Sequence, residues 1–318
     1  MIFAAFLWAL LAATFAKSGL ADLLRPETDT VFNGGLGPLD QPLFDNLPLT
    51  SYTLHQWAPG WIPADCKAMV EGQNLSATDM TVWNVAYADC GDPWVMCQHA
   101  TAQLNLTAMI DLFGRLPVKM RSMVRHLAAI PGNPWAYNSG DNLLFSGTVG
   151  RISVFAHEVG HSMDSHGYFN GTGGEFHASS LWLDSFAKDS GVADYYANTD
   201  QGENHSQEVV VALFDANVPG GLGSVTGNWS AISHQYATIQ GFVGDGGNTL
   251  TPGGMCSHRH NNSAAVPMTT EDAAQGSAPD VSLTAPVHVY DFKPMEPVVN
   301  ATVVKGDGEA GPMVVNVF

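Results

Sequence analysis

The stretch ISVFAHEVGHSM, residues 152–163, restricts the fold of this chain more than any other segment. It is strongly apolar and predicts a helix. His157 and His161 are four residues apart, so an α-helix places both imidazoles on the same side. The pair can therefore bind one metal ion. Two histidines do not complete such a site, so the fold must bring a third ligand to this helix from elsewhere in the chain.

Glu158 gives the histidine pair a possible catalytic role. It is turned by about 100° from His157 around the helix axis. Its carboxylate would then lie beside an open coordination position, where it can accept a proton from zinc-bound water. Two histidines and one carboxylate form a common catalytic zinc set, so we expect one Zn²⁺ ion as cofactor. The competing interpretation is a helix with two ordinary histidines and no metal.

Few carboxylates follow the histidine pair as possible third ligands. Glu175 lies fourteen residues past His161, within a Gly-rich segment, and Asp184 lies in the sequence LWLDSF. Glu203 and Glu208 come next and share one predicted helix. Spacing alone leaves all four open.

Helical periodicity favours Glu203 among these carboxylates. Glu203 falls on the same helical face as apolar Val210, which predicts that it points inward. Glu208 shares a face with Asn204, a glycosylation sequon that must face solvent if it carries a glycan. The alternative is that Asp200 and Glu203 form a capping box, in which Glu203 would only bond the helix start.

The overall charge argues against two classes of partner. The chain has 318 residues, with 12 Lys and Arg against 30 Asp and Glu, for a net charge of -18. Binding to nucleic acid or to an anionic membrane surface needs a basic patch. We therefore expect neither partner. Independently of the charge, we expect a monomer and, if the zinc motif is that of a peptidase, a peptide or protein substrate.

The N-terminus predicts secretion. The apolar run from residue 2 to about residue 13 is followed by small residues, which is typical of a signal peptide covering residues 1–21. The run is too short to span a membrane. A high density of N-x-[ST] sequons fits a glycosylated extracellular protein. These candidate glycosylation sites are Asn74, Asn105, Asn170, Asn204, Asn228, Asn261 and Asn300.

Four cysteines in a secreted chain predict two disulfide bonds. Cys90 and Cys97 flank the turn-rich sequence GDPWVM and could close a short loop. Cys66 would then pair with Cys256. This pairing is an inference, because connectivity cannot be read from spacing.

Composition divides the remainder of the chain. Residues 22–54 are rich in Pro, Gly, Asp and Thr and are expected to form an irregular lead-in. Residues 55–245 carry the periodic segments, and residues 246–318 are expected to be an extended or partly disordered tail. A hairpin is expected near residues 131–147, ending in an edge strand from Asn142 to Phe145. The part of this strand around Leu143 to Phe145 would bind an extended peptide substrate by strand addition. Helices are expected at 63–72, 101–116, 118–127, 151–164, 179–189, 203–218 and 230–242, and a strand at 80–88.

Several segments resemble a known family. VFAHEVGHSMDSH at 154–166 and the stretch at 181–221 resemble the catalytic domain of anthrax-lethal-factor-like zinc metallopeptidases. They are closer to secreted fungal conidiation-specific proteins that share this domain, as are VWNVAYADCGDPWVMCQH at 82–99 and FGRLPVKMRSMVRHL at 113–127. The resemblance covers roughly residues 55 to 245. It implies a zincin-like α+β fold, with a small mixed sheet packed on helices that include the HExxH helix.

The resemblance also assigns roles. It implies that Glu203, which opens the sequence ENHSQ, is the third zinc ligand, and that Gln207 supports the site. Asp164 is a further candidate for such a supporting role. Tyr196, seven residues before Glu203, is implied to stabilise the oxyanion, and its neighbour Tyr195 could do so instead. Other family members usually carry apolar or aromatic residues after this Glu, and a glycan on Asn204 would stand beside the ligand.

Two functions follow as expectations. The first is a secreted zinc metallopeptidase in which Glu158 activates a water held by zinc. The second is a catalytically silent secreted glycoprotein, associated with a wall or spore, that keeps the same scaffold. The intact HExxH sequence favours the first, because a structural site has no need of Glu158.

Overall fold

The computed structural model describes residues 23–25, 30–167, 175–241, 243–244 and 247–272, together with two short strands at 303–304 and 315–317. The expected signal peptide and the sequons Asn170 and Asn300 lie outside these residues. Within the described part, no helix is long and apolar enough to cross a membrane.

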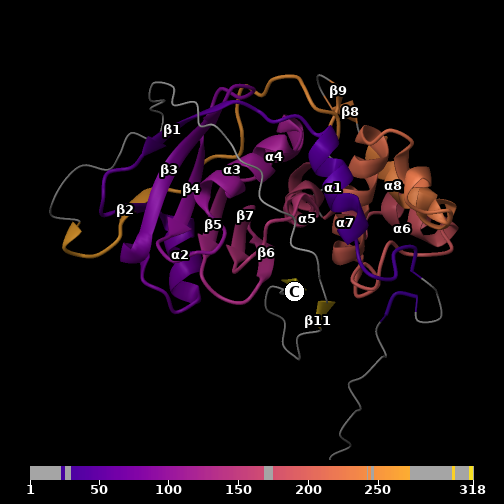
Figure 1. The fold of residues 1–318 in the computed structure, drawn as a ribbon, viewed down its shortest axis with the longest axis horizontal. Helices are drawn as coiled ribbons and strands as arrows, with labels where there is room; N and C mark the ends of the chain where they lie inside the picture. Colours follow the sequence, from indigo (N-terminus) through magenta and orange to yellow (C-terminus); the bar gives the residue numbers. More distant parts are fainter. Residues whose placement is uncertain are drawn as a thin grey trace, which may run out of the picture.

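A mixed sheet forms the centre of one half of the molecule (Figure 1). Its strands β4, β5 and β7 run parallel, and the other neighbours in the sheet are antiparallel. In spatial order the strands are β1 (Tyr52–Gln56), β3 (Met80–Tyr87), β4 (Trp94–His99), β5 (His126–Ile130), β7 (Asn142–Ser146), β6 (Trp135–Ser139), β12 (Val315–Val317) and β11 (Val303–Val304). Two small ladders pair β2 (Trp61–Pro63) with β10 (Ala265–Pro267) and β8 (Val243–Gly244) with β9 (Gly247–Asn248).

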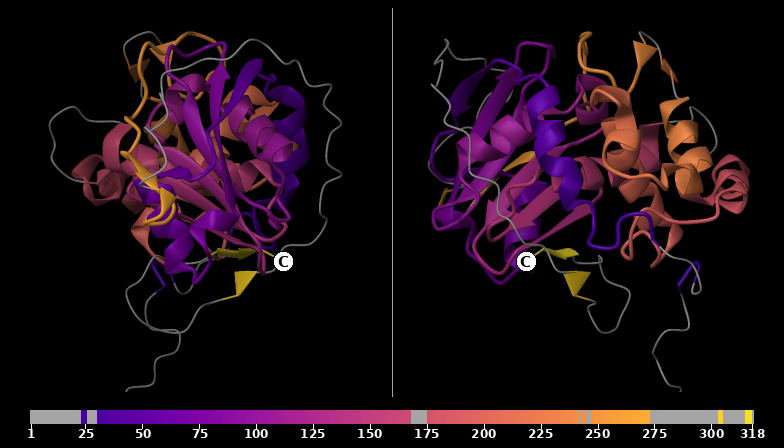
Figure 2. Two further views of the ribbon diagram at one scale, coloured as in Figure 1. Left: turned by 90° about the vertical axis from the view of Figure 1, so that its left-hand side faces the viewer. Right: turned by 45° about the vertical axis from the view of Figure 1, so that its right-hand side comes forward.

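Helices lie on both faces of the sheet and form a second group beside it (Figures 1 and 2). The α-helices are α1 (Gly37–Asn46), α2 (Ala64–Gly72), α3 (Leu106–Arg115), α4 (Val118–Arg121), α5 (Ile152–Ser162), α6 (Ser180–Lys188), α7 (Gln201–Asn217) and α8 (Ser233–Gln240). A single π-helical turn, Met163–Gly167, continues α5.

Side chains along the central strands alternate between the two faces of the sheet, so each face has its own hydrophobic core. On β5, Leu127 and Ala129 join the core that contains α3, α5 and α7, whereas Ala128 and Ile130 join the core under α2. All five residues of this strand are buried, as expected for a parallel strand covered on both faces. The sheet thus presents one face to α5, the helix of the HExxH motif.

Helix α5 lies between the sheet and α7, and all of its residues except His161 are buried. Against the sheet, the ring of Phe155 stacks on Phe145 of β7 with centroids 4.1 Å apart. Against α7, a Cβ on Gly160 would lie only 3.0 Å from the Cα of Ser206. Glycine at this position therefore allows the two helices to approach closely, which brings the start of α7 to the histidines.

Several expected elements are confirmed. The structure contains helices within 63–72, 101–116, 151–164, 179–189 and 230–242, and a strand at 80–87; the helix expected at 203–218 spans 201–217. The hairpin is also present, as β6 and β7. The α+β class is therefore correct, with a sheet and helices as the sequence indicated.

Other expectations are wrong. The lead-in is not irregular, because it contains α1, whose Leu39 and Leu43 are fully buried. Strand β7 is not an edge strand, since it lies between β5 and β6. The predicted helix at 118–127 ends at Arg121, and residues from His126 onward form β5. In the expected tail, residues 265–267 are extended and pair with β2 as β10, a contact that the sequence did not indicate.

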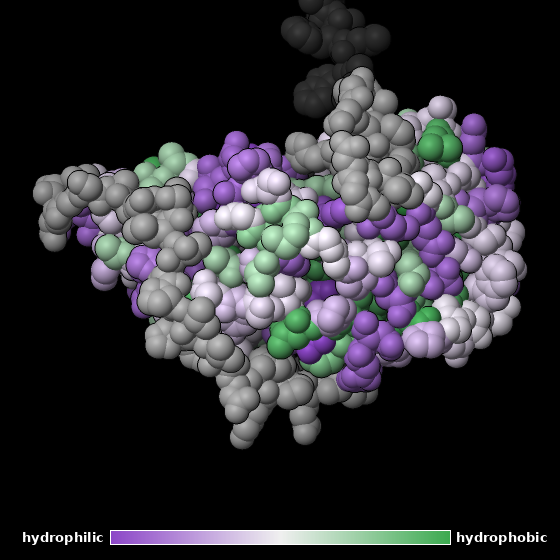
Figure 3. Space-filling view, turned by 90° about the horizontal axis from the view of Figure 1, so that it is seen from above, coloured by the Kyte–Doolittle hydropathy of each residue, from purple (hydrophilic) through white to green (hydrophobic). Residues whose placement is uncertain are grey.

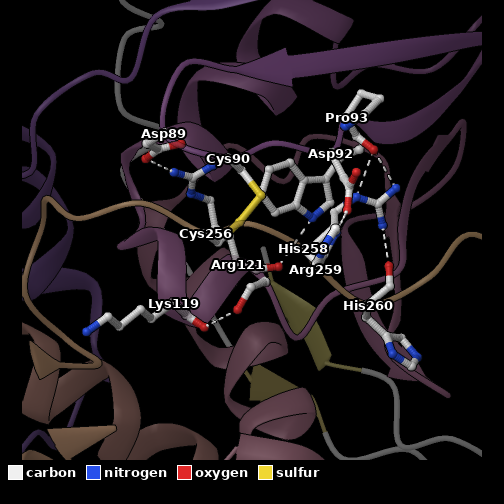
Figure 4. Close-up of a disulfide and its surroundings, with 12 residues drawn as sticks. Asp89, Cys90, Asp92, Pro93, Lys119, Arg121, Cys256, His258, Arg259 and His260 are labelled. Atoms are coloured by element: carbon white, nitrogen blue, oxygen red, sulfur yellow. Dashed lines mark hydrogen bonds and ion pairs between the residues drawn. A yellow bond between two sulfur atoms is a disulfide. The ribbon is translucent and has the colours of Figure 1, made fainter. Parts of the chain in front are cut away.

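The disulfide pairing differs from the expected one. Cys66 of α2 bonds Cys97 of β4, and Cys90 bonds Cys256. The expected short loop does not close, because residues 94–99 form β4 and carry Cys97 away from the β3–β4 turn that holds Cys90. The first bond fixes α2 to its face of the sheet. The second fixes the segment around Cys256 to the β3–β4 turn (Figure 4).

The segment after Cys256 is held by more than the disulfide. Arg259 is buried and donates hydrogen bonds to the carbonyl oxygen of Pro93 (Figure 4) and to that of Arg125. Nearby, the buried Arg121 pairs with Asp89. Backbone oxygens and the Asp89 carboxylate accept hydrogen bonds from these guanidinium groups, which offsets much of the cost of burying them.

Glu208 on α7 is a buried carboxyl group whose ionisation we expect to limit stability. Its two carboxyl oxygens have no hydrogen-bond partner among the described residues. Burial, and then the neighbouring charges of Asp189 and Asp194, raise the pKa of Glu208 well above its usual value of 4.5. The folded protein therefore keeps this group protonated at a pH where the unfolded chain ionises it.

Glu208→Gln should stabilise the protein at neutral pH. A raised folded-state pKa contributes stability below pH 4.5 that is lost as the pH rises, and Gln cannot ionise. The gain in unfolding free energy should grow by about 1.4 kcal/mol per pH unit above that value until the folded group ionises. Urea denaturation at pH 4, 6 and 8 measures this. Parallel pH profiles for variant and wild type would contradict it.

Candidate metal-binding site

Side chains from α5 and α7 converge at one point. Nε2 of His157 lies 3.0 Å from Oε2 of Glu203, and Nε2 of His161 lies 3.5 Å from the same oxygen. The two Nε2 atoms are 3.2 Å apart. Zinc binds such ligands at about 2.0–2.1 Å, so two ligands on a tetrahedral ion lie about 3.3 Å apart. All three separations fit that value, so the residues present suit one zinc ion.

The first turn of α7 provides both the N-cap of this helix and the candidate ligand Glu203. The side chain of Asp200 accepts a hydrogen bond from the Glu203 backbone N–H at 3.0 Å, so Asp200 is the N-cap of α7. The Glu203 side chain, however, points to His157 and His161. Asp200 therefore caps the helix. The Glu203 side chain contacts the histidines and does not bond the helix start, as it would in a capping box.

The outer nitrogen of each imidazole is held by a residue of α7. Nδ1 of His157 lies 3.1 Å from Oε1 of Gln207, whose own Nε2 donates to Asp194 at 2.7 Å. Because the amide nitrogen faces Asp194, the amide oxygen faces His157 and accepts its Nδ1–H. Nδ1 of His161 lies 3.0 Å from Oγ of Ser206, which can accept in the same way. Such outer partners fix the tautomer of metal-binding histidines.

These tautomers leave three lone pairs facing one another. With both Nδ1 atoms protonated, each Nε2 is an acceptor, and the Glu203 oxygen is an acceptor too. Three acceptors so close together repel unless a positive charge lies between them. Burial alone would raise the pKa of Glu203, but the two imidazoles outweigh it and lower that pKa strongly. Burial lowers the pKa of His161, but Glu203 and Glu158 raise it to about 9, so without a metal a proton on His161 supplies this positive charge. The cluster therefore attracts a cation.

Glu158 lies beside this cluster and is poised for proton transfer. It is 1% exposed, and neither carboxyl oxygen has a hydrogen-bond partner among the described residues. Burial raises its pKa to about 7, against the lowering effect of His157 and His161. A carboxyl group with a pKa near neutrality can both accept and release a proton under ordinary conditions.

A cavity of about 310 Å³ opens onto the cluster. Its lining is mostly polar and includes both Glu158 and Glu203. The lining residues are Tyr137, Asn138, Gly140, Glu158, His161, Asp164, Ser165, Glu175, His177, Gly202 and Glu203. Water and a polar substrate can therefore reach the carboxylate and the metal ligands.

The two candidate tyrosines lie in different environments. Tyr196 is 5% exposed, and its ring centroid lies 5.6 Å from that of His157. Burial, and then repulsion from Glu203 and Glu158, raise its pKa far above the usual value, so the phenol keeps its proton. Tyr195 is 44% exposed. Of the two, Tyr196 is the one placed to donate a hydrogen bond near the cluster.

The other candidate carboxylates do not reach both histidines. Glu175 lines the cavity and pairs with His177, and Asp184 is exposed on α6. Glu208 is buried elsewhere along α7. Asp164, expected to support the metal ligands, instead pairs with His177 at 2.5 Å. Among the described acidic residues, Glu203 is thus the one that meets both His157 and His161.

Two supporting residues were missed by sequence reasoning. Ser206 and Asp194 hold His161 and Gln207, respectively. Ser206 could have been noticed as the residue before Gln207 on the same turn of α7, but nothing in the sequence links Asp194 to the site. Its position depends on how the segment before α7 folds back onto the helix.

The sequon at Asn204 is not a glycosylation site in this fold. Its side chain is fully buried and lies 3.4 Å from Oε1 of Gln201. Asn204 faces inward because α7 is buried on both sides at this point. A glycan on Asn204 therefore has no room beside Glu203 in this fold. Four other sequons are exposed, namely Asn74, Asn105, Asn228 and Asn261.

The fold and this cluster define an α+β protein with a candidate metal centre of two histidines and one glutamate. Comparison with known proteins then places the chain in a family. The family model for conidiation-specific protein Con-13 matches residues 31–304, so the chain belongs to the Con-13 family. It is similar to conidiation-specific protein 13 of Neurospora crassa, with 30% identity over 276 residues, covering 85% of this chain and 79% of that protein. No solved structure matches.

The expected resemblance to conidiation-specific proteins is therefore confirmed. The resemblance to lethal-factor-like peptidases stays a prediction, as does the zincin fold.

Proposed function

We propose that this protein is a secreted zinc metallopeptidase with a zincin-like catalytic domain. The observation that carries the proposal is the meeting of three ligand atoms, from His157, His161 and Glu203, beside the Glu158 carboxyl group, which has no hydrogen-bond partner among the described residues. A structural metal site is usually closed by four protein ligands, whereas a catalytic one leaves a position open. Three ligands that border an accessible cavity suit the catalytic kind.

Each residue of the site has a definite task in peptide hydrolysis. A bound Zn²⁺ ion would supply Lewis-acid chemistry, which lowers the pKa of water and polarises a carbonyl group. Glu158 accepts a proton from the attacking water and delivers it to the leaving amine. Gln207 and Ser206 keep the imidazoles oriented. Tyr196 donates its phenol proton in a hydrogen bond to the oxyanion.

The expected peptide-binding strand requires a correction. Residues 143–145 belong to β7, whose two edges are both paired within the sheet, so they cannot bind a peptide by strand addition. Tyr137 and Asn138 of the next strand, β6, line the cavity. Strand β12 pairs only with Trp135 and Ala136 of β6, so we propose that an extended substrate lies along the end of β6 beyond them.

Secretion agrees with the disulfides of the described chain. Bonds such as Cys66–Cys97 persist in oxidising compartments and are rare in the cytosol. Together with the N-terminal apolar run, they support an extracellular peptidase.

Chelator-sensitive proteolysis tests the proposal. The purified protein, incubated with unfolded proteins and a peptide library, should cleave at least one substrate class. A chelator should stop the cleavage and stoichiometric zinc should restore it. Absence of cleavage across the library by zinc-loaded protein would overturn the peptidase and leave a catalytically silent glycoprotein on the same scaffold.

Tyr196→Phe should lower the turnover number by about 10²–10³-fold, as loss of one oxyanion donor does in other hydrolases. The value of KM and the zinc content should stay unchanged, since the phenyl ring still fills the site. Tyr195→Phe is the matched control, because it removes an exposed phenol one residue away. Steady-state kinetics on the same substrate separates the two variants. Equal activities would show that Tyr196 makes no hydrogen bond in the transition state.

A further inference from the structure

A second group of metal-ligating side chains lies on the wall of the same cavity. It consists of Asp164 on the turn after α5, Glu175, and His177 on the short 3-10 helix Phe176–Ala178. One ligand atom from each lies within 4.8 Å of the others. None of the three belongs to the cluster formed by His157, His161 and Glu203, and none has a task in the proposed hydrolysis.

Asp164 holds the ring of His177 in a fixed orientation. The carboxylate accepts the backbone N–H of His177 at 2.7 Å and lies 2.5 Å from its Nδ1. Asp164 is 6% exposed, so the carboxylate is shielded from solvent, while the His177 side chain is 23% exposed toward the cavity. A carboxylate on Nδ1 fixes the tautomer with the proton on that nitrogen and leaves the Nε2 lone pair available to a metal ion.

Glu175 lies opposite that free nitrogen. Its Oε2 is 3.5 Å from Nε2 of His177. This separation exceeds the 2.7–3.2 Å of ordinary N–H···O hydrogen bonds. It is close to the distance of about 3.3 Å between two ligands that share one zinc ion. The group thus repeats, at the cavity wall, the carboxylate–histidine–metal arrangement found around protein metal sites.

We propose that His177 and Glu175 form a second binding site for a zinc-like divalent cation, with Asp164 as the residue that orients His177. Nε2 of His177 and the Glu175 carboxylate are the protein ligands, and water fills the remaining positions. The site has fewer ligands than the first, and the Glu175 side chain is 61% exposed. It therefore binds zinc more weakly. The proposal concerns metal binding alone and does not depend on peptidase activity.

Zinc titration of the metal-free full-length protein tests this second site. Isothermal titration calorimetry of the wild type should resolve two zinc ions, one tight and one weak. Glu175→Gln should weaken the second by about tenfold or more and leave the first unchanged, and His177→Gln should do the same. Asp164→Asn should weaken it by about 10–100-fold, the usual cost of losing such an orienting partner.

Two control variants show whether the weak ion binds at this site and not elsewhere on the surface. Glu71→Gln removes an exposed carboxylate on α2 that does not line the cavity, and both zinc ions should remain. Glu203→Ala should show the reverse pattern, losing the tight ion and keeping the weak one. A wild type that binds a single zinc, or a weak ion unaffected by Glu175→Gln, would overturn the proposal. Since Glu175 is exposed, Glu175→Gln should fold normally. Its zinc titration therefore decides the test even if the variants at the buried residues Asp164 and Glu203 fail to fold.

Discussion

Glu158→Gln is expected to keep one tightly bound zinc per molecule and to lose essentially all peptide hydrolysis. The Gln amide has nearly the same shape and cannot accept a proton from water. Glu158 is not one of the three converging ligand atoms, so the metal should stay. General acid–base catalysis contributes about 10²–10⁴-fold. In the proposed mechanism Glu158 both accepts the proton of the water and donates it to the leaving amine. We therefore expect a loss of at least about 10³-fold in the turnover number.

The environment of Glu158 makes this substitution a sharp test. The carboxyl group is buried and lacks a hydrogen-bond partner among the described residues, so Gln disrupts no contact seen in the fold. The variant should melt at the wild-type temperature or above it, because a buried ionisable group is removed. The two quantities to measure are zinc per molecule and turnover of a chelator-sensitive substrate. Glu71→Gln, an exposed site on α2, is the control for loss of a carboxylate. Activity within a few fold of wild type would eliminate Glu158 as the base.

Local sequence patterns predicted the parts of the site that lie on one helix. The spacing of His157 and His161 depends only on helix geometry, and the inward face of Glu203 follows from the apolar periodicity of α7. What the sequence could not show is how α5 and α7 approach each other. That contact is made at Gly160 and Ser206, and it decides which carboxylate reaches the histidines.

The errors in the fold share one physical origin, since each depends on contacts distant in sequence. Strands β4 and β5 are buried on both faces, so they lack the alternation that identifies a half-buried strand. Residues 37–46 form a helix around Pro42 because the buried side chains of that segment pack on the core. Cysteine pairing follows from which face of the sheet each side chain occupies, and spacing does not reveal it.

The surface contributes little to the choice of function. Viewed from above, hydrophobic residues form small groups among polar ones on this face (Figure 3). The charge of -18 argues against nucleic acid and anionic membranes as partners. The proposal therefore depends on the cluster of His157, His161 and Glu203, and the strongest test is one that removes a candidate ligand.

Glu203→Ala should abolish tight zinc binding. The variant keeps His157 and His161 but loses the only carboxylate that meets both of them among the described residues. Loss of an outer-sphere partner already costs about 10–100-fold in affinity, so loss of a direct ligand should cost at least about 100-fold. Glu203→Gln, which keeps the volume and removes the charge, should also bind zinc poorly.

Zinc content and thermal stability give independent readings of this loss. After dialysis against low free zinc, the wild type should retain one ion per molecule and Glu203→Ala almost none. A ligand that binds only the folded state stabilises it, so a chelator should lower the melting temperature of the wild type and leave the variant unchanged. The double variant Glu203→Ala with Glu175→Gln excludes any contribution from the second proposed site. If Glu203→Ala kept its zinc and its response to chelator, the ion would have to be held without the start of α7. The short distances among His157, His161 and Glu203 would then result only from the packing of α5 against α7 and would not indicate a metal site.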